Sequence, residues 1–160
     1  MLGRRRHFDR SLIGAYGHDD KVCAYTALIA TAECKKPKHT VVTVLTDKEE
    51  TGSDGNTGMQ SDFLRYFIYD LAKQDGNEGY RVLSKSKCLS ADVNAAFDPT
   101  FPSVYEAKNC SFINEGVVIS KYTGHGGKYD TSDASAEFMG EIRAMLAKND
   151  VKWQVGELGK

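Results

Sequence analysis

The sequence has no apolar run approaching the ~20 residues that a membrane-spanning helix requires. The three arginines at positions 4–6 are not followed by an apolar stretch of signal-peptide length, and we interpret them as a solvated tail. An excess of one charge is also missing, because the formal net charge of the 160 residues is −1. No overall field therefore favours nucleic acid or an anionic membrane as a partner. We expect a cytoplasmic protein without either partner.

Paired metal-binding cysteines are absent as well. Cys23, Cys34, Cys88 and Cys110 show no C-x-x-C spacing, which excludes a zinc ribbon and a thioredoxin-type motif. Each lies in or beside an apolar stretch, where free cysteine behaves as a small hydrophobe, so we expect reduced, buried thiols.

A phosphate-binding loop is also excluded. The stretch GHGGK at residues 124–128 fails the motif G-x-x-x-x-G-K-[ST], which requires glycine at Tyr122 and serine or threonine at Tyr129.

The residues that are present indicate one globular domain in which strands and helices alternate. Apolar residues make up 41% and charged residues 27%, as in average soluble proteins. The patterns predict a buried helix over residues 19–34, a helix from Ser61 with Leu64, Phe67, Ile68 and Leu71 on one face, and a last helix beginning at 131–133. They predict strands over 40–46, 87–93, 116–122 and 151–155, and a flexible loop over 124–132. The alternation predicts an α/β fold, a three-layer α/β/α sandwich around a mostly parallel sheet with 40–46 at its centre.

Acidic residues stand at the ends of the predicted strands, where ligands bind in such sheets. Glu49 and Glu50 follow the strand over 40–46, Asp92 ends the strand over 87–93, and Asp19 and Asp20 open the first helix. Each acidic group also has an ordinary explanation. Asp19 and Asp20 could stabilise the start of a helix through its dipole. Glu49 and Glu50 could be solvated loop charges, and Asp92 could be a helix cap. Together they indicate a divalent metal site, because neighbouring carboxylates raise each other's pKa unless a cation neutralises them.

Four segments carry a resemblance to a known family. They are residues 13–26 (IGAYGHDDKVCAYT), 45–53 (LTDKEETGS), 55–61 (GNTGMQS) and 86–99 (SKCLSADVNAAFDP). In this order and spacing they resemble the aminopeptidase I and aspartyl aminopeptidase family of two-zinc metallopeptidases, most closely its bacterial branch. The resemblance implies a zinc-peptidase fold of the phosphorylase/hydrolase-like type, and removal of N-terminal amino acids from peptides by attack of a metal-activated water.

The resemblance also implies roles for individual residues. Asp19 would bridge two zinc ions (with manganese or cobalt as substitutes), Asp92 would bind the first metal and Glu50 the second. Glu49 would be the general base, and the Asp19–Asp20 peptide bond would be cis. Lys121 matches a family position that contacts substrate, and Tyr129 is a second candidate. The family forms homo-oligomers.

This chain departs from the family pattern in its histidines. Family members supply one histidine ligand before an inserted dimerisation domain and another near the C-terminus, and none of His7, His18, His39 and His125 stands at either place. We therefore expect a fragment: residues 1–12 as a basic leader that ends the inserted domain, and 13–160 as a partial, incomplete catalytic domain, inactive alone. The alternative is a non-catalytic remnant or an assembly subunit of such a peptidase.

Overall fold

The computed structural model describes residues 12–125 and 129–156. The predicted leader at 1–12 therefore lies almost wholly outside the described residues. The chain divides into two compact units, Met1–Val93 and Asn94–Lys160, which are described separately below.

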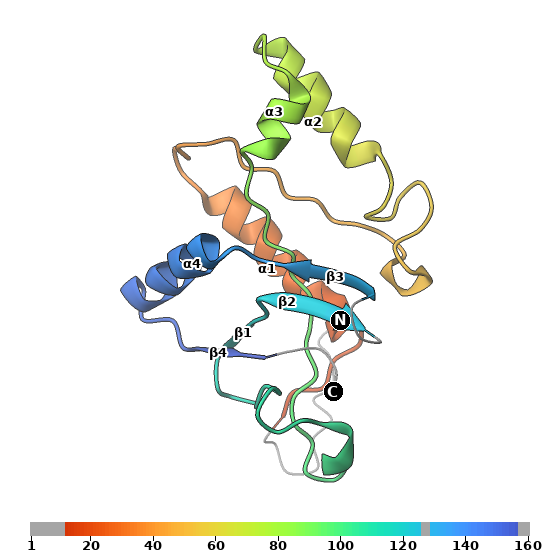
Figure 1. Ribbon diagram of the computed structural model, residues 1–160, viewed down its shortest axis with the longest axis vertical. Coiled ribbons are helices and arrows are strands. Elements are labelled where there is room, and N and C mark those ends of the chain that lie inside the picture. Colours follow the sequence, from red (N-terminus) through yellow and green to blue (C-terminus); the bar gives the residue numbers. More distant parts are fainter. Residues whose placement is uncertain (1–11, 126–128, 157–160) are drawn as a thin grey trace. The chain divides into compact units, whose positions relative to one another are not determined.

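The first unit begins with helix α1, His18–Glu33, within one residue of the predicted bounds (Figure 1). Gly17 precedes it with φ 69°, a left-handed conformation that glycine adopts at no steric cost. The prediction that this helix is buried is wrong, because no residue of α1 is buried. Its apolar side chains Val22, Tyr25 and Leu28 are 41%, 64% and 49% exposed.

Two further helices of this unit form a helical hairpin. In α2, Phe63–Gln74, the predicted apolar positions Leu64, Ile68 and Leu71 are half-buried and Ala72 is buried, whereas Phe67 of the same predicted face is 41% exposed. The N–H of Asn77 donates to the carbonyl of Ala72 at 2.8 Å and closes the turn into α3, Gly79–Ser84, a helix that the sequence patterns did not predict.

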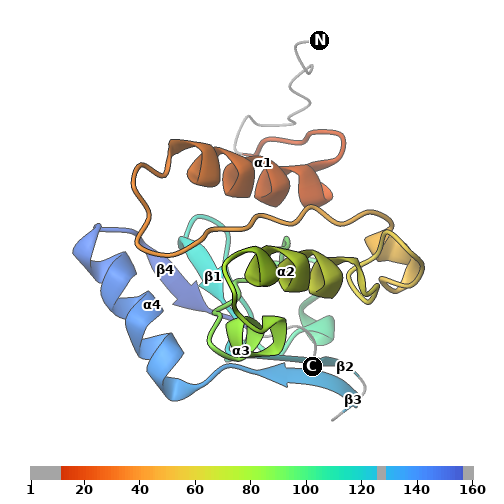
Figure 2. The same cartoon turned by 90° about the horizontal axis from the view of Figure 1, so that it is seen from above.

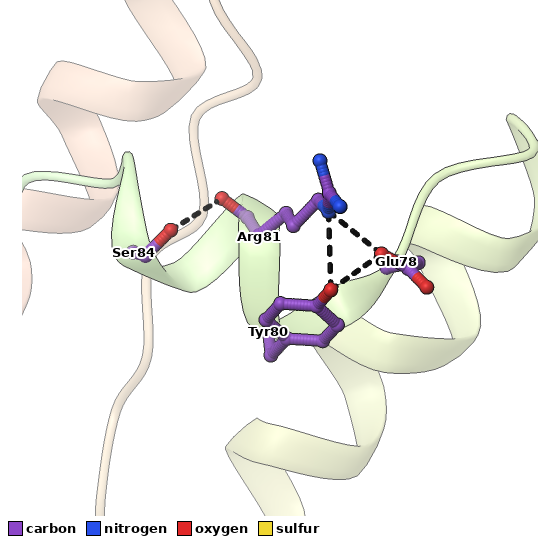
Figure 3. A network of polar contacts seen from close by, with 4 residues as sticks. All are labelled: Glu78, Tyr80, Arg81 and Ser84. Carbon is purple, nitrogen blue, oxygen red and sulfur yellow. Dashed lines mark hydrogen bonds and ion pairs between the residues drawn. The ribbon is translucent and has the colours of Figure 1, made fainter.

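The start of α3 is fixed by a small polar network (Figure 3). The carboxylate of Glu78 accepts from the Tyr80 hydroxyl and the Arg81 guanidinium, each at 2.7 Å, and Ser84 Oγ donates to the Arg81 carbonyl at 2.9 Å. Gly79 is required here, since a Cβ at this position would lie 2.1 Å from Cδ1 of Tyr69.

Two predicted strands of the first unit are not formed. Residues 40–46 and 87–93 are irregular, and no described residue makes a backbone hydrogen bond to 40–46. Val42 and Val44 are each 38% exposed, so the central position predicted for this segment is wrong. The physical reason is that a strand needs a neighbouring strand to pair with, whereas apolar, β-branched character alone supplies none.

The second unit contains the strands. β1, Val117–Ile119, pairs in parallel with β4, Trp153–Val155, which confirms short strands within the predicted 116–122 and 151–155. β2, Tyr122–His125, pairs antiparallel with β3, Tyr129–Asp133. The prediction of a loop over 124–132 is therefore wrong for the residues that lie in these two strands. A short 3₁₀ helix, η2, spans Pro102–Val104.

Helix α4, Ala136–Lys148, begins a few residues later than predicted. Its cap is Ser135, whose Oγ accepts the Phe138 N–H at 3.1 Å, rather than a residue of 131–133. Serine satisfies one of the free N–H groups at a helix start, which explains why the helix begins here.

Helices with a small parallel strand pair agree with the α/β class. Few side chains are enclosed: among the described residues, Ala72 and Leu146 are the buried hydrophobic ones. No described helix is long and apolar enough to cross a membrane.

Candidate metal centre

A glycine-rich loop of the first unit positions Glu49 and Glu50. Both lie in the 3₁₀ helix η1, Glu49–Thr51, and the Glu49 carbonyl accepts the N–H groups of Gly52 and Ser53 at 2.9 and 3.2 Å. The loop is closed by the Asp47 N–H, which donates to the Thr57 carbonyl at 3.2 Å. The two glutamates are thus held by backbone hydrogen bonds.

Gly58 allows the loop to fold back on itself. A Cβ at this position would lie 2.1 Å from the carbonyl oxygen of Ser53, closer than real Cβ atoms approach any atom. Gln60 adds two bonds to the same turn: its N–H donates to the Ser53 carbonyl at 3.2 Å and its Nε2 to the Gly52 carbonyl at 2.8 Å.

Asp19 and Asp20 lie in the first turn of α1 with non-helical backbone angles, and the peptide bond between them is cis, as the resemblance implied. Asp19 is exposed, whereas Asp20 is half-buried. Oδ1 of Asp20 is buried and has no hydrogen-bond partner among the described residues.

The predicted carboxylates act on one another electrostatically. Desolvation raises the pKa of Glu49, and the negative charges of Glu50, Asp92, Asp19 and Asp20 raise it further, in that order. Segments around positions 19, 49 and 92 therefore come close enough in the first unit for their charges to interact. Asp92 is exposed, and its Oδ1 accepts the Val93 N–H at 2.7 Å.

The donor set is suited to a divalent cation but is not arranged as a finished site. Several neighbouring carboxylates destabilise one another's charged form, and a cation would relieve this repulsion. Oxygen donors alone suit Mg²⁺ or Mn²⁺ better than zinc, which favours imidazole and thiolate. Within the described part of the chain, no three His, Cys, Asp or Glu side chains are grouped so as to hold a metal ion.

The sequence patterns do not indicate that Cys23 lies beside this cluster. Burial, followed by a hydrogen bond to Asp20 and the charges of Asp20, Asp92 and Asp19, raises the pKa of the half-buried Cys23 to about 12. The spacing of Asp20 and Cys23, three positions apart on one helix, was the available signal. All four cysteines are free, but Cys34 and Cys88 are exposed, so the prediction of buried thiols is wrong for these two.

The predicted substrate contacts belong to the second unit. Lys121 is half-buried and forms an ion pair with Asp133, and its carbonyl accepts the Ala134 N–H at 2.7 Å. Tyr129 begins β3, but its side chain lies outside what the structure describes. His18 and His39 are exposed, and His7 lies outside the described residues.

Comparison with known proteins defines the class. The family model described as aminopeptidase I zinc metalloprotease (M18) matches residues 5–160. The chain is 46% identical over 157 residues to a probable M18 family aminopeptidase 1 of Clostridium acetobutylicum, covering 96% of this chain and 34% of that protein. A protein of the same description from Borrelia garinii subsp. bavariensis is 47% identical over 160 residues, with coverage of 96% and 35%.

Solved structures agree with the sequence matches. The crystal structure of an M18 family aminopeptidase from Thermotoga maritima superposes with a TM-score of 0.87 at 42% identity, over 98% of this chain and 36% of that chain. Aminopeptidase I from Clostridium acetobutylicum gives a TM-score of 0.86 at 46% identity, over 98% and 34%.

The chain belongs to the aminopeptidase I (M18) family of zinc metalloproteases. It spans about a third of the length of the curated relatives that it matches.

Proposed function

We propose that this chain supplies the carboxylate half of the active site of a two-zinc aminopeptidase, which acts in the cytoplasm as a homo-oligomer and removes N-terminal residues from peptides. The observation that carries the proposal is the match of the family model over residues 5–160; the negative charges of Glu50, Asp92 and Asp19, which raise the pKa of Glu49, support it. In the whole protein this chain contributes to a three-layer α/β/α sandwich.

The residues divide into ligands and a base. Asp19, Glu50 and Asp92 would be the ligands, and Asp19 would serve both ions. Bound zinc would lower the pKa of a coordinated water toward neutrality and polarise the scissile carbonyl. Glu49 takes up the proton of the attacking water and passes it to the leaving amine, the general-base role that the family resemblance implies for it.

Two residues of the second unit are proposed to contact the substrate. The ammonium of Lys121 would pair with a carboxylate or carbonyl of the peptide. Without substrate, it forms an ion pair with Asp133 at the base of the β2–β3 hairpin. Tyr129, at the start of β3, is the second proposed contact.

Homo-oligomer formation is proposed from the family. A yeast relative, at 22% identity and a TM-score of 0.55, is described as a dodecamer. We propose that the whole protein to which this chain corresponds also assembles from identical subunits.

Metal titration of the 160-residue chain tests the ligand assignment. We expect the chain to bind zinc weakly. Mn²⁺ should compete with zinc more strongly here than at sites that contain imidazole, because the donors are carboxylates. Asp92→Asn and Glu50→Gln should each weaken binding at least tenfold, whereas Asp75→Asn, in the turn after α2, should leave it unchanged. Equal affinity in all four proteins would refute the assignment.

A further inference from the structure

The loop between η1 and α2 contains an Asp-Gly pair, Asp54–Gly55 (Figure 2). An aspartate followed by glycine can close a five-membered ring, in which the glycine amide nitrogen attacks the carboxyl carbon of the aspartate side chain. A C–N bond forms and one water leaves, and glycine has no side chain that hinders the approach. Water then opens this succinimide at either carbonyl and gives aspartate or isoaspartate, in which the backbone runs through the side-chain carbon. The reaction needs no oxidant, reductant or metal.

The local structure leaves the nitrogen of Gly55 open to this reaction. Asp54 and Gly55 are exposed, and nothing lies within 4 Å of the position that a Cβ on Gly55 would take. The N–H groups of Gly52 and Ser53 donate to the Glu49 carbonyl, whereas the N–H of Gly55 donates to no backbone carbonyl of the described residues. The attack at Asp54 therefore breaks no backbone hydrogen bond of the loop.

A second Asp-Gly pair, Asp75–Gly76, is held in a different way. It lies in the turn between α2 and α3. The N–H of Gly76 donates to the Lys73 carbonyl at 3.1 Å, and the N–H of Asp75 donates to the Ala72 carbonyl at 3.2 Å. The end of α2 must therefore open before the nitrogen of Gly76 can attack, and such local opening costs free energy. The chain thus carries its own comparison for Asp54.

We propose that Asp54 is a site of spontaneous isoaspartate formation, and that this modification disrupts the turn that carries Glu49 and Glu50. Isoaspartate lengthens the backbone by one carbon between Asp54 and Gly55. The turn has little room for it, because a Cβ at Gly58 would already lie 2.1 Å from the Ser53 carbonyl oxygen and 2.8 Å from that of Asp54. A longer backbone therefore displaces the hydrogen bonds that close the turn. The modification does not depend on the proposed catalytic role.

Ageing of the folded chain at neutral pH tests the site. Trypsin releases the two pairs in separate peptides, residues 49–65 and 74–81, and electron-transfer fragmentation distinguishes isoaspartate from aspartate in each. We expect isoaspartate to accumulate about fivefold faster at Asp54 than at Asp75, the factor that corresponds to the one hydrogen bond that Gly76 must first break. In urea the two rates should become similar. Equal rates in the folded chain, or an unchanged difference in urea, would overturn the proposal.

Asp54→Glu is the matched control for the effect on the turn. It keeps the charge, but its longer side chain cannot close the five-membered ring, so its peptide 49–65 should stay free of isoaspartate at this position. Amide hydrogen exchange then compares the aged chain with the aged variant. The N–H groups of Gly52 and Gln60, which donate to the Glu49 and Ser53 carbonyls, should exchange faster in the isoaspartate form. Equal exchange in the isoaspartate form and the variant would contradict the proposed disruption of the turn.

Discussion

The side-chain amide of Gln154 in β4 makes two hydrogen bonds with the backbone of Phe112: Oε1 accepts the Phe112 N–H at 2.8 Å and Nε2 donates to its carbonyl at 2.9 Å. Nε2 also donates to the carbonyl of Gly116 at 3.2 Å. The side chain of Gln154 therefore links β4 to the segment that precedes β1.

We expect Gln154→Ala to lower the free energy of unfolding by about 0.5–1.5 kcal/mol, because it removes the hydrogen bonds to the exposed backbone of Phe112. Trp153, the one tryptophan of the sequence, is its neighbour and reports on this unit by fluorescence in a urea titration. The matched control is Gln74→Ala at the exposed end of α2, which should change stability by less than about 0.5 kcal/mol. Equal losses in the two variants would show that the amide bonds contribute nothing specific.

The sequence predicted helices better than strands, for a physical reason. α1, α2 and α4 were located because a helix satisfies its own backbone hydrogen bonds, and its apolar period, with the turn at Asp75 and Gly76, can be recognised locally. The strand over 40–46 was not formed because its hydrogen bonds need a partner that local sequence does not specify. The sequence predicts a loop where the β2–β3 hairpin forms, because glycine and polar residues dominate this segment.

The site carboxylates stay a prediction, and the sequence patterns do not indicate the residues that surround them. Asp19, Glu49, Glu50 and Asp92 were selected by position and by family resemblance, and their charges do act on Glu49. The buried, unpartnered Oδ1 of Asp20 and the thiol of Cys23 depend on the kinked backbone at the start of α1, which no side-chain pattern encodes. The ion pair of Lys121 with Asp133 depends on the register of the hairpin.

Cys23 should be the least reactive of the described cysteines. Its pKa of about 12, above the ordinary 9.0, leaves almost no thiolate at pH 8, and the thiolate is the nucleophile. Iodoacetamide labelling followed by mass spectrometry should modify the exposed Cys34 and Cys88 at least tenfold faster. Because the folded-state pKa is raised, this thiol stabilises the fold below pH 9, and its contribution is lost as the pH rises toward 12. Labelling of Cys23 at the rate of Cys34 would contradict this.

Gly58→Ala should disrupt the loop that carries Glu49 and Glu50. The added Cβ would lie 2.1 Å from the Ser53 carbonyl oxygen and 2.8 Å from that of Asp54, and backbone atoms cannot move aside cheaply. We expect a loss of about 1–3 kcal/mol in a urea titration followed by circular dichroism. In α4 nothing lies within 4 Å of a Cβ at Gly140, so Gly140→Ala should stabilise by about 0.5–1 kcal/mol. Similar changes in both variants would refute the close approach at Gly58.

The division between ligands and base is tested most directly in a chimera, in which this chain replaces the matching 34% of the Clostridium acetobutylicum relative, to which it is 46% identical. Zinc content and aminoacyl-anilide hydrolysis are measured on the chimera and on its Glu49→Gln and Glu50→Gln variants. We expect an active chimera, a Glu49→Gln variant that keeps its zinc and loses at least 100-fold in turnover, and a Glu50→Gln variant that loses zinc. A folded chimera that binds zinc and has no activity, or a Glu49→Gln variant with undiminished turnover, would contradict it.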